Sequence, residues 1–183
     1  MPGHQNIACI DCHQPAGGSF RQQVQAALRA IMWRENNDVD FGASEVNNND
    51  CNSCHYNRYD RHATYRFLEP RFARERRILA PHQCRSCHRV HSGKRVSIKL
   101  DFCQHCHQKL NISNDATRPT HVELISSRSW NRCLSCHDYH GNHIMDPPTN
   151  LNQAINVDTL IQYADGGGSP YTKEVLVQAK ESR

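Results

Sequence analysis

The sequence predicts a mostly α-helical protein with much irregular structure and little or no β-sheet. Three observations predict this class. Aromatic residues make up only 7% of the 183 residues and the mean hydropathy is −0.78, so few side chains are available for a core. Apolar residues with a helical period occur only in short runs. All ten cysteines fall in five copies of one pentapeptide, C-x-x-C-H.

The five pentapeptides are spaced too irregularly for a solenoid. In C-x-x-C-H the two thiols can form thioethers with the two vinyl groups of one haem, and the following His then ligates the iron. Zinc ribbons also use C-x-x-C, but a four-cysteine site consumes the pairs two at a time, and five pairs leave one over. A redox-active C-x-x-C disulfide needs no following His. The motifs therefore predict five covalently attached haem c groups.

The predicted haem-binding residues follow directly from the motifs, which we number one to five in chain order. The attachment cysteines are Cys9, Cys12, Cys51, Cys54, Cys84, Cys87, Cys103, Cys106, Cys133 and Cys136. The predicted proximal iron ligands are His13, His55, His88, His107 and His137.

The sixth ligand decides what each iron can do, because a filled position suits electron transfer and an open one can bind a substrate. Methionine is scarce, since only Met1, Met32 and Met145 are present, whereas eight histidines lie outside the proximal positions. His91 and His140 each follow a proximal histidine by three residues, so each must reach a neighbouring haem. The distal ligands that we expect are His4, His62, His91, His121 and His140.

Three histidines remain outside this set. His143 is the first alternative ligand and His82, two residues before a haem cysteine, is the second, and a surface position is the other interpretation of both. His105 lies between two haem cysteines with its side chain directed away from the haem, so we expect it at the surface.

The sequence predicts short helices and loops between the first three motifs. Ser19 can cap a helix that runs to about Trp33 and packs an apolar face on a haem or a neighbouring helix. The polar stretch from residue 35 to 50 is typical of a surface loop. A further helix is predicted from Pro70, a favourable first-turn residue, to just before Pro81. The apolar face of the first helix contains Phe20, Val24, Ala27, Leu28 and Ile31.

The second half of the chain has weaker signals. Residues 94–102 alternate in polarity, which indicates a short strand or an extended hairpin. A last helix is predicted from an Asn150 cap to Tyr163, with the GGGSP sequence at 166–170 ending it and a loose arm following from Tyr171. Its expected inward residues are Leu151, Ile155 and Ile161.

The spacing of the motifs indicates how the haems are grouped. Only fifteen residues separate Cys87 from Cys103, so we expect the third and fourth haems to be the closest pair. We divide the chain into one haem-packed unit over residues 1–148 and a haem-free helix and tail over residues 149–183. One macrocycle per about 37 residues would supply the apolar surface that the side chains lack, so folding should depend on haem.

Charge is concentrated in the middle of the sequence. Residues 58–99 carry twelve Lys or Arg and three acidic residues, a net +9, whereas residues 1–57 carry −3 and residues 100–183 carry −2. A basic segment can indicate nucleic-acid binding. Five haems, however, bring about ten propionate carboxylates. We therefore expect that the protein does not bind nucleic acid. The arginines of this segment should instead pair with propionates, contact solvent or form a docking patch for an acidic partner; they include Arg71, Arg74, Arg76 and Arg77.

No segment of the sequence resembles a signal peptide or a membrane span. Haem c is attached outside the cytoplasm. We therefore expect a periplasmic or otherwise extracytoplasmic protein, with a leader peptide or a membrane anchor ahead of the given sequence.

With its five C-x-x-C-H motifs and the histidines placed between residues 4 and 143, the chain resembles the multihaem c-type cytochromes of respiratory chains. It is similar to small pentahaem carriers such as the electron-donor subunit of the cytochrome c nitrite reductase system. Its C-x-x-C-H-x-x-H segments, residues 84–91 and 133–140, resemble class III cytochromes. The resemblance implies a haem-cored fold and electron transfer between respiratory redox partners: a quinol-linked donor, and a terminal reductase or an outer-membrane conduit.

Two functions stay open on the sequence. The first is an electron carrier with no catalytic residue of its own. The second is a small multihaem reductase of nitrite, hydroxylamine or a sulfur oxyanion, in which one iron has an open position and His143 or an arginine polarises the ligand. Every motif ends in His and eight further histidines are available for five positions, which favours the carrier.

Overall fold

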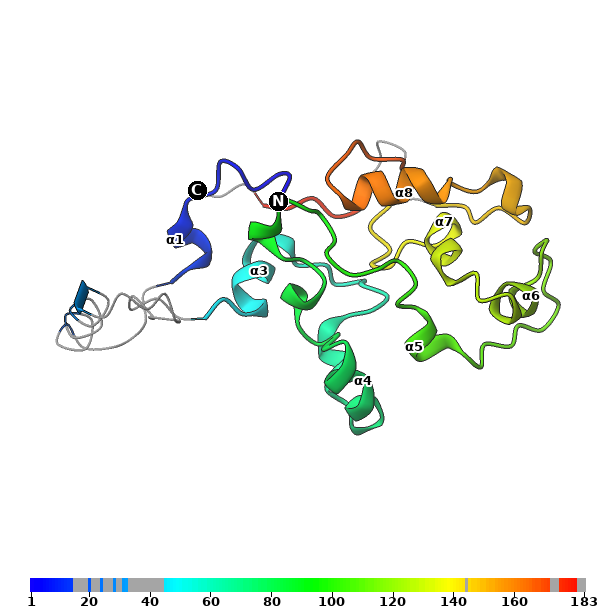
Figure 1. The fold of residues 1–183 in the computed structure, drawn as a ribbon, viewed down its shortest axis with the longest axis horizontal. Coiled ribbons are helices and arrows are strands. Elements are labelled where there is room, and N and C mark those ends of the chain that lie inside the picture. Colours follow the sequence, from blue (N-terminus) through cyan, green and yellow to red (C-terminus); the bar gives the residue numbers. More distant parts are fainter. Residues whose placement is uncertain are drawn as a thin grey trace.

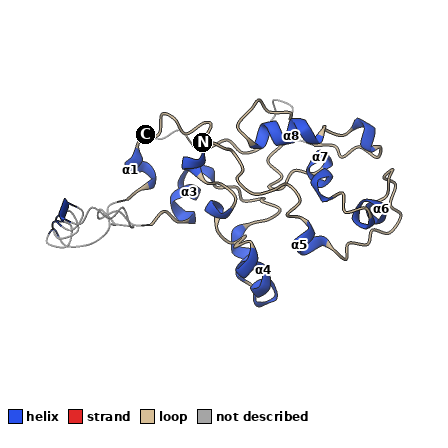
Figure 2. Ribbon diagram, viewed as in Figure 1, coloured by secondary structure: helices blue, strands red, loops and turns tan. Residues whose placement is uncertain are grey.

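The computed structural model describes residues 1–14, 20, 24, 28, 31–32, 45–143, 145–171 and 175–180. In this part of the chain, short helices alternate with irregular segments and no strand is present (Figures 1 and 2). Its β-type pairing consists of two isolated bridges, Arg118 with Asn150 and His143 with Val175. The expectation of a mostly helical, largely irregular chain with little or no sheet is therefore confirmed for the described residues.

Each C-x-x-C-H motif lies on or at the end of a short helical segment. These segments are α1 (Cys9–Cys12), α3 (Asn48–His55), η3 (Cys84–Ser86), α5 (Gln104–His107) and α7 (Cys133–Cys136). In four motifs the amide of the histidine donates to the carbonyl of the first cysteine at 2.8 to 3.0 Å. One helical turn brings positions i, i+3 and i+4 to the same side, so both cysteines and the histidine of a motif face one way.

The remaining segments connect the motif helices. They are η1 (Thr64–Leu68), η2 (Pro70–Phe72), α4 (Ala73–Ile78), η4 (Val90–Ser92), α6 (His121–Ser126), η5 (Trp130–Arg132), η6 (Leu151–Gln153) and α8 (Val157–Ala164). In Figure 1, α4 projects from the body of the molecule, α1 and α3 lie towards one end, and α6 lies at the other. Side-chain caps fix the starts of three α-helices, with Asn47 for α3, Thr120 for α6 and Asn156 for α8, and Asn150 caps η6.

The predicted helix from Pro70 is present as η2 followed by α4, and α4 ends at Ile78, before Pro81. The predicted last helix is divided instead into η6 and α8, because Ala154 is extended between them. The break gives α8 its own register, in which Leu160 and Ala164 are buried and Ile161 is 45% exposed. The inward orientation expected of Ile161 is therefore wrong.

The strand expected at residues 94–102 is also absent from the structure. The amides of Arg95 and Val96 both donate to the carbonyl of Ala164, and the amide of Ser97 donates to Cys87. These amides are satisfied by the end of α8 and by the third motif, so no ladder with a second strand forms.

The tail is attached to the body rather than loose. The ring of Tyr171 stacks on His143 at a centroid distance of 4.1 Å. The amide of Leu176 donates to the carbonyl of Asn142, and that of Lys180 donates to Cys54 in α3. The described part of the tail therefore contradicts the expected loose arm.

Most of the helix expected over residues 19–33 and most of the loop expected over residues 35–50 lie outside the described residues. Four of the apolar positions of that helix are described as helical and exposed, with Phe20 82% and Ile31 76% exposed. The loop prediction extends into α3, which begins at Asn48.

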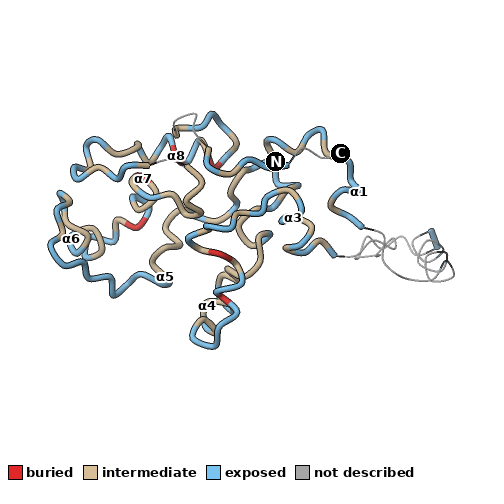
Figure 3. Tube along the Cα trace, turned by 180° about the vertical axis from the view of Figure 1, so that it is seen from behind, coloured by how far each residue is buried: buried red, intermediate tan, exposed pale blue. Residues whose placement is uncertain are grey.

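The packed interior is small, as Figure 3 shows. The buried apolar residues among those described are Ala63, Phe67, Trp130, Leu160 and Ala164. The chain has an accessible surface of 13713 Å², whereas a compact protein of its mass would have about 9,000 Å². None of the helices in the described part is long and apolar enough to cross a bilayer.

Candidate functional site

The ten histidines predicted as iron ligands meet in five pairs, and each pair joins one motif histidine to one histidine outside the motifs. The ring centroids of the pairs lie 5.8 to 6.3 Å apart. The pairs are His13 with His91, His55 with His4, His88 with His140, His107 with His62, and His137 with His121.

This separation matches two imidazoles bound to opposite sides of one metal ion. A metal–imidazole bond is about 2 Å long, so two such bonds and the two rings place the centroids about 6 Å apart. His91 follows the third motif but faces His13 of the first, and His140 follows the fifth motif but faces His88 of the third. Both histidines thus reach the site of another motif.

Several of the paired rings are fixed through Nδ1, which leaves Nε2 free for the opposite partner. His62 Nδ1 lies 2.6 Å from the carbonyl oxygen of Tyr139, and His88 Nδ1 lies 2.8 Å from that of Arg95. His4 makes only a long contact of 3.4 Å with the carbonyl of Pro2. A hydrogen bond at the second ring nitrogen is the usual way in which proteins orient a histidine ligand.

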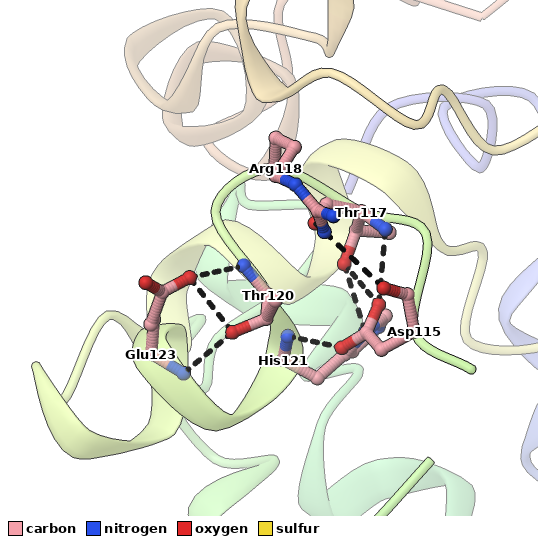
Figure 4. A network of polar contacts seen from close by, with 6 residues as sticks. All are labelled: Asp115, Thr117, Arg118, Thr120, His121 and Glu123. Atoms are coloured by element: carbon pink, nitrogen blue, oxygen red, sulfur yellow. Dashed lines mark hydrogen bonds and ion pairs between the residues drawn. The ribbon is translucent and has the colours of Figure 1, made fainter. Parts of the chain in front are cut away.

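Carboxylates hold two further rings of the pairs. His140 Nδ1 lies 2.9 Å from Asp60 Oδ2, and His121 Nδ1 lies 3.0 Å from Asp115 Oδ2 (Figure 4). Hydrogen bonds from Thr117 and His121 hold the pKa of Asp115 well below its ordinary value. Burial raises the pKa of Asp60, but its contacts with His140 and His62 outweigh burial and lower the pKa overall, so both carboxylates are charged acceptors at neutral pH.

Burial lowers the pKa of four paired histidines, because the charged imidazolium is poorly solvated there. These are His55, His62, His88 and His137. The lowered pKa keeps the rings neutral at neutral pH, and neutral imidazole is the form that binds a metal ion.

All ten cysteines are free thiols, and they lie beside the histidine pairs. The thiols of Cys51 and Cys84 share a hydrogen bond that raises the pKa of Cys51 and lowers that of Cys84. Cys103 and Cys133 are joined in the same way, with the pKa of Cys103 raised and that of Cys133 lowered. The attachment cysteines of the second and third motifs are therefore in contact, as are those of the fourth and fifth motifs.

The prediction that the third and fourth haems are the closest pair stays a prediction. Tyr139 lies between the third and fourth sites: its ring stacks on His62 at 4.2 Å and meets His140 edge-on at 4.9 Å. Its phenol is buried, which raises its pKa, and the thiols of Cys87 and Cys103 contribute to the same shift. One buried aromatic side chain therefore joins the third and fourth sites.

The fourth and fifth sites open into one apolar cavity of about 650 Å³. The cavity is lined by both cysteines and the histidine pair of each of these motifs, and by apolar side chains that include Phe102, Leu124 and Trp130. A cavity of this size and character is suited to a large apolar ligand. The histidine rings and the thiols face the same space, as a covalently attached macrocycle requires.

The donor set fits haem better than a bare metal ion. In the described residues no group of three or more His, Cys, Asp or Glu side chains is arranged to hold a metal ion alone. Zinc needs about four protein ligands, whereas a haem iron takes four nitrogens from its porphyrin and needs only two axial ligands from the chain. Two imidazoles per site satisfy that need.

The three histidines left out of the predicted set also stay outside the pairs. His143 stacks on Tyr171, and its Nδ1 atom is buried without a partner among the described residues, as is that of His82. Ser135 lies between the cysteines of the fifth motif, and its Oγ atom is also buried without a hydrogen-bond partner among the described residues. The His105 side chain faces no second histidine in the described part of the chain.

The arginines of the basic segment have local partners. Arg76 Nη1 donates to the carbonyls of Phe67 and Glu69 at 2.7 and 2.8 Å. Arg71 forms an ion pair of 2.9 Å with Glu69 and lies over the ring of Phe72. Arg74 and Arg77 are exposed on α4. Part of the positive charge is thus used to hold the α4 region together.

The residues that orient the rings are not found by the sequence reasoning. Asp60 stands two residues before His62 but bonds the ring of His140, and Asp115 lies six residues before His121. The carbonyls of Tyr139 and Arg95 leave no signature in a sequence at all. An acidic residue shortly before a candidate distal histidine is the only signal that could have indicated the two carboxylates.

Comparison of the chain with models of protein families, with curated proteins and with solved structures found no match.

Proposed function

We propose that the chain is an extracytoplasmic electron-transfer protein with a haem-cored fold and five covalently attached, bis-histidine haem c groups. The observation that carries this proposal is the set of five ring pairs, because each pair contains one C-x-x-C-H histidine and the spacing suits one iron. Random placement of histidines would not give every motif one opposite ring at the same separation.

The sparse interior supports a haem-cored fold. Five buried apolar residues in the described part cannot offset the chain entropy of a protein of this length. The apolar cavity at the fourth and fifth motifs offers a surface that bound macrocycles would cover.

The sites form a continuous series from the first motif to the fifth. The thiol of Cys12 is close enough to Cys51 and Cys54 to raise its own pKa, after burial as the larger cause. The Cys51–Cys84 contact links the second and third sites, Tyr139 lies between the third and fourth, and the Cys103–Cys133 contact links the fourth and fifth. Electrons could therefore pass along the chain in motif order.

When bound, each haem supplies a one-electron ferric–ferrous couple. The histidine pairs would fill both axial positions of such haems, which would leave no position for a substrate, and ligation without methionine would favour low potentials. A reductase would need a motif histidine with no ring opposite, and all five have one. The proposed partners are a respiratory donor such as a quinol-linked protein and a terminal reductase or an outer-membrane conduit.

The ferric spectrum of the mature protein tests this function. We expect only low-spin signals, unchanged by cyanide or nitrite, and full reoxidation of the reduced protein by a multihaem acceptor. A high-spin component, or a shift on addition of nitrite, would instead favour the reductase.

A further inference from the structure

Among the described residues, two of the five ring pairs differ from the rest in having a charged acceptor on the distal ring. Asp60 bonds His140 in the third site, and Asp115 bonds His121 in the fifth. The distal ring of the fourth site, His62, has a neutral carbonyl as its acceptor. This difference concerns only side chains of the chain itself, and neither carboxylate belongs to a haem motif.

Both carboxylates are largely buried and make several hydrogen bonds each, so they are fixed parts of their sites. Their side chains are only 15% and 12% exposed for Asp60 and Asp115. Asp60 Oδ1 also accepts the amide of His62 at 2.8 Å, so this one residue holds parts of two distal histidines. Asp115 Oδ2 also accepts the amide of His121 at 2.6 Å, and Oδ1 accepts the amide of Thr117 at 3.0 Å (Figure 4).

A carboxylate that accepts the Nδ1 proton of an imidazole draws that proton away from the ring and makes the ring a more basic ligand. A more basic axial ligand stabilises ferric iron more than ferrous iron, so the reduction potential falls. Low exposure strengthens the effect, because solvent screens the charge less. A backbone carbonyl is a weaker acceptor than a carboxylate and has a smaller effect.

We propose that Asp60 and Asp115 are positioning residues that make the third and fifth haems the low-potential members of the series. The inference rests on the proposed function, and it concerns how the five couples differ rather than whether they exist. Each couple gains one electron, and no bond is made or broken. The result is a series in which the potential does not fall evenly from one end to the other.

The test is a redox titration of the mature holoprotein and of its Asp60→Asn and Asp115→Asn variants, each fitted to five one-electron steps. Each variant should raise one potential by at least a tenfold change in the reduction equilibrium, which is about 59 mV for one electron. Asp60→Glu and Asp115→Glu keep the charge and should restore the potentials of the parent protein. Asp158→Asn removes one exposed charge at the start of α8 and serves as the control, with all five couples unmoved.

The outcomes separate this inference from the function on which it rests. Five low-spin haems whose potentials are the same in the parent and in both Asn variants would overturn the role of the carboxylates alone. An equal shift in Asp158→Asn would also overturn it, since the effect would then be general charge. A parent protein without five low-spin haems would overturn the proposed function and this inference together. If Asp60→Asn fails to mature, Asp115→Asn, which lies in a separate loop, decides the outcome.

Discussion

Removal of one distal histidine should open one iron and leave the other four unchanged. His62 is the informative choice, because its ring stands at 82° to that of His107, whereas the rings of the other four pairs are inclined by 25° to 38°. Nearly perpendicular axial imidazoles leave two iron d orbitals close in energy, so the ferric signal of this site should have the widest spread of g values.

The structure sets the size of the expected change. His62→Gly removes one ring of one pair in five, so about one fifth of the iron should become high-spin. The low-spin signal with the widest g spread should vanish, and the signals of the four remaining pairs should persist. Added imidazole should occupy the space of the missing side chain and restore a low-spin spectrum.

Electron paramagnetic resonance of the oxidised proteins measures both changes. His105→Gly is the matched control, since His105 lies within the fourth motif but faces no second histidine in the described part of the chain, and its spectrum should match that of the parent. A fully low-spin His62→Gly spectrum, or loss of a signal with a narrow g spread in place of the widest one, would refute the assigned pair.

Four further predictions follow from the same sites and from the small core. His91→Met should keep five haems and raise one reduction potential, because a thioether ligand favours ferrous iron. A redox titration identical to that of the parent would remove His91 from the ligands of the first site. Cys103→Ala with Cys106→Ala should lower the intact mass by one haem, and a mass that still accounts for five would contradict attachment at the fourth motif. The haem-free chain made in the cytoplasm should show no cooperative thermal transition, because the interior of its described part contains only five buried apolar residues. A sharp transition would contradict a haem-dependent fold. Leu160 is only 3% exposed, so Leu160→Ala should lower the free energy of unfolding of the holoprotein by about 2–5 kcal/mol. Ile161 is 45% exposed, so Ile161→Ala should lower it by less than about 1 kcal/mol. Equal losses in the two variants would contradict the register of α8.

The parts of the site that the sequence predicts are those governed by local geometry. A C-x-x-C-H motif specifies one helical turn, and the hydrogen bond from His137 to Cys133 at 3.0 Å shows such a turn. Counting histidines against motifs also indicates which rings are available. It does not determine which ring meets which motif, because His13 and His91 are brought together by the fold and not by their neighbours in sequence.

The fold is harder to predict where a segment is held by contacts with distant parts of the chain. Residues 94–102 alternate in polarity, yet their amides bond to Ala164 and Cys87, which the alternation cannot show. A three-residue interruption in the predicted last helix, residues 154–156, places Leu160 in the interior in place of Ile161. The position of Tyr139 between two sites likewise depends on aromatic contacts with His62 and His140 from another part of the chain.

An anomalous difference map from a crystal of the mature protein, recorded at the iron absorption edge, would locate every haem iron. We expect five iron peaks per chain, each midway between the rings of one pair: His13 and His91, His55 and His4, His88 and His140, His107 and His62, and His137 and His121. Fewer than five peaks, or an iron whose sixth ligand is water or a histidine from a different pair, would contradict this expectation.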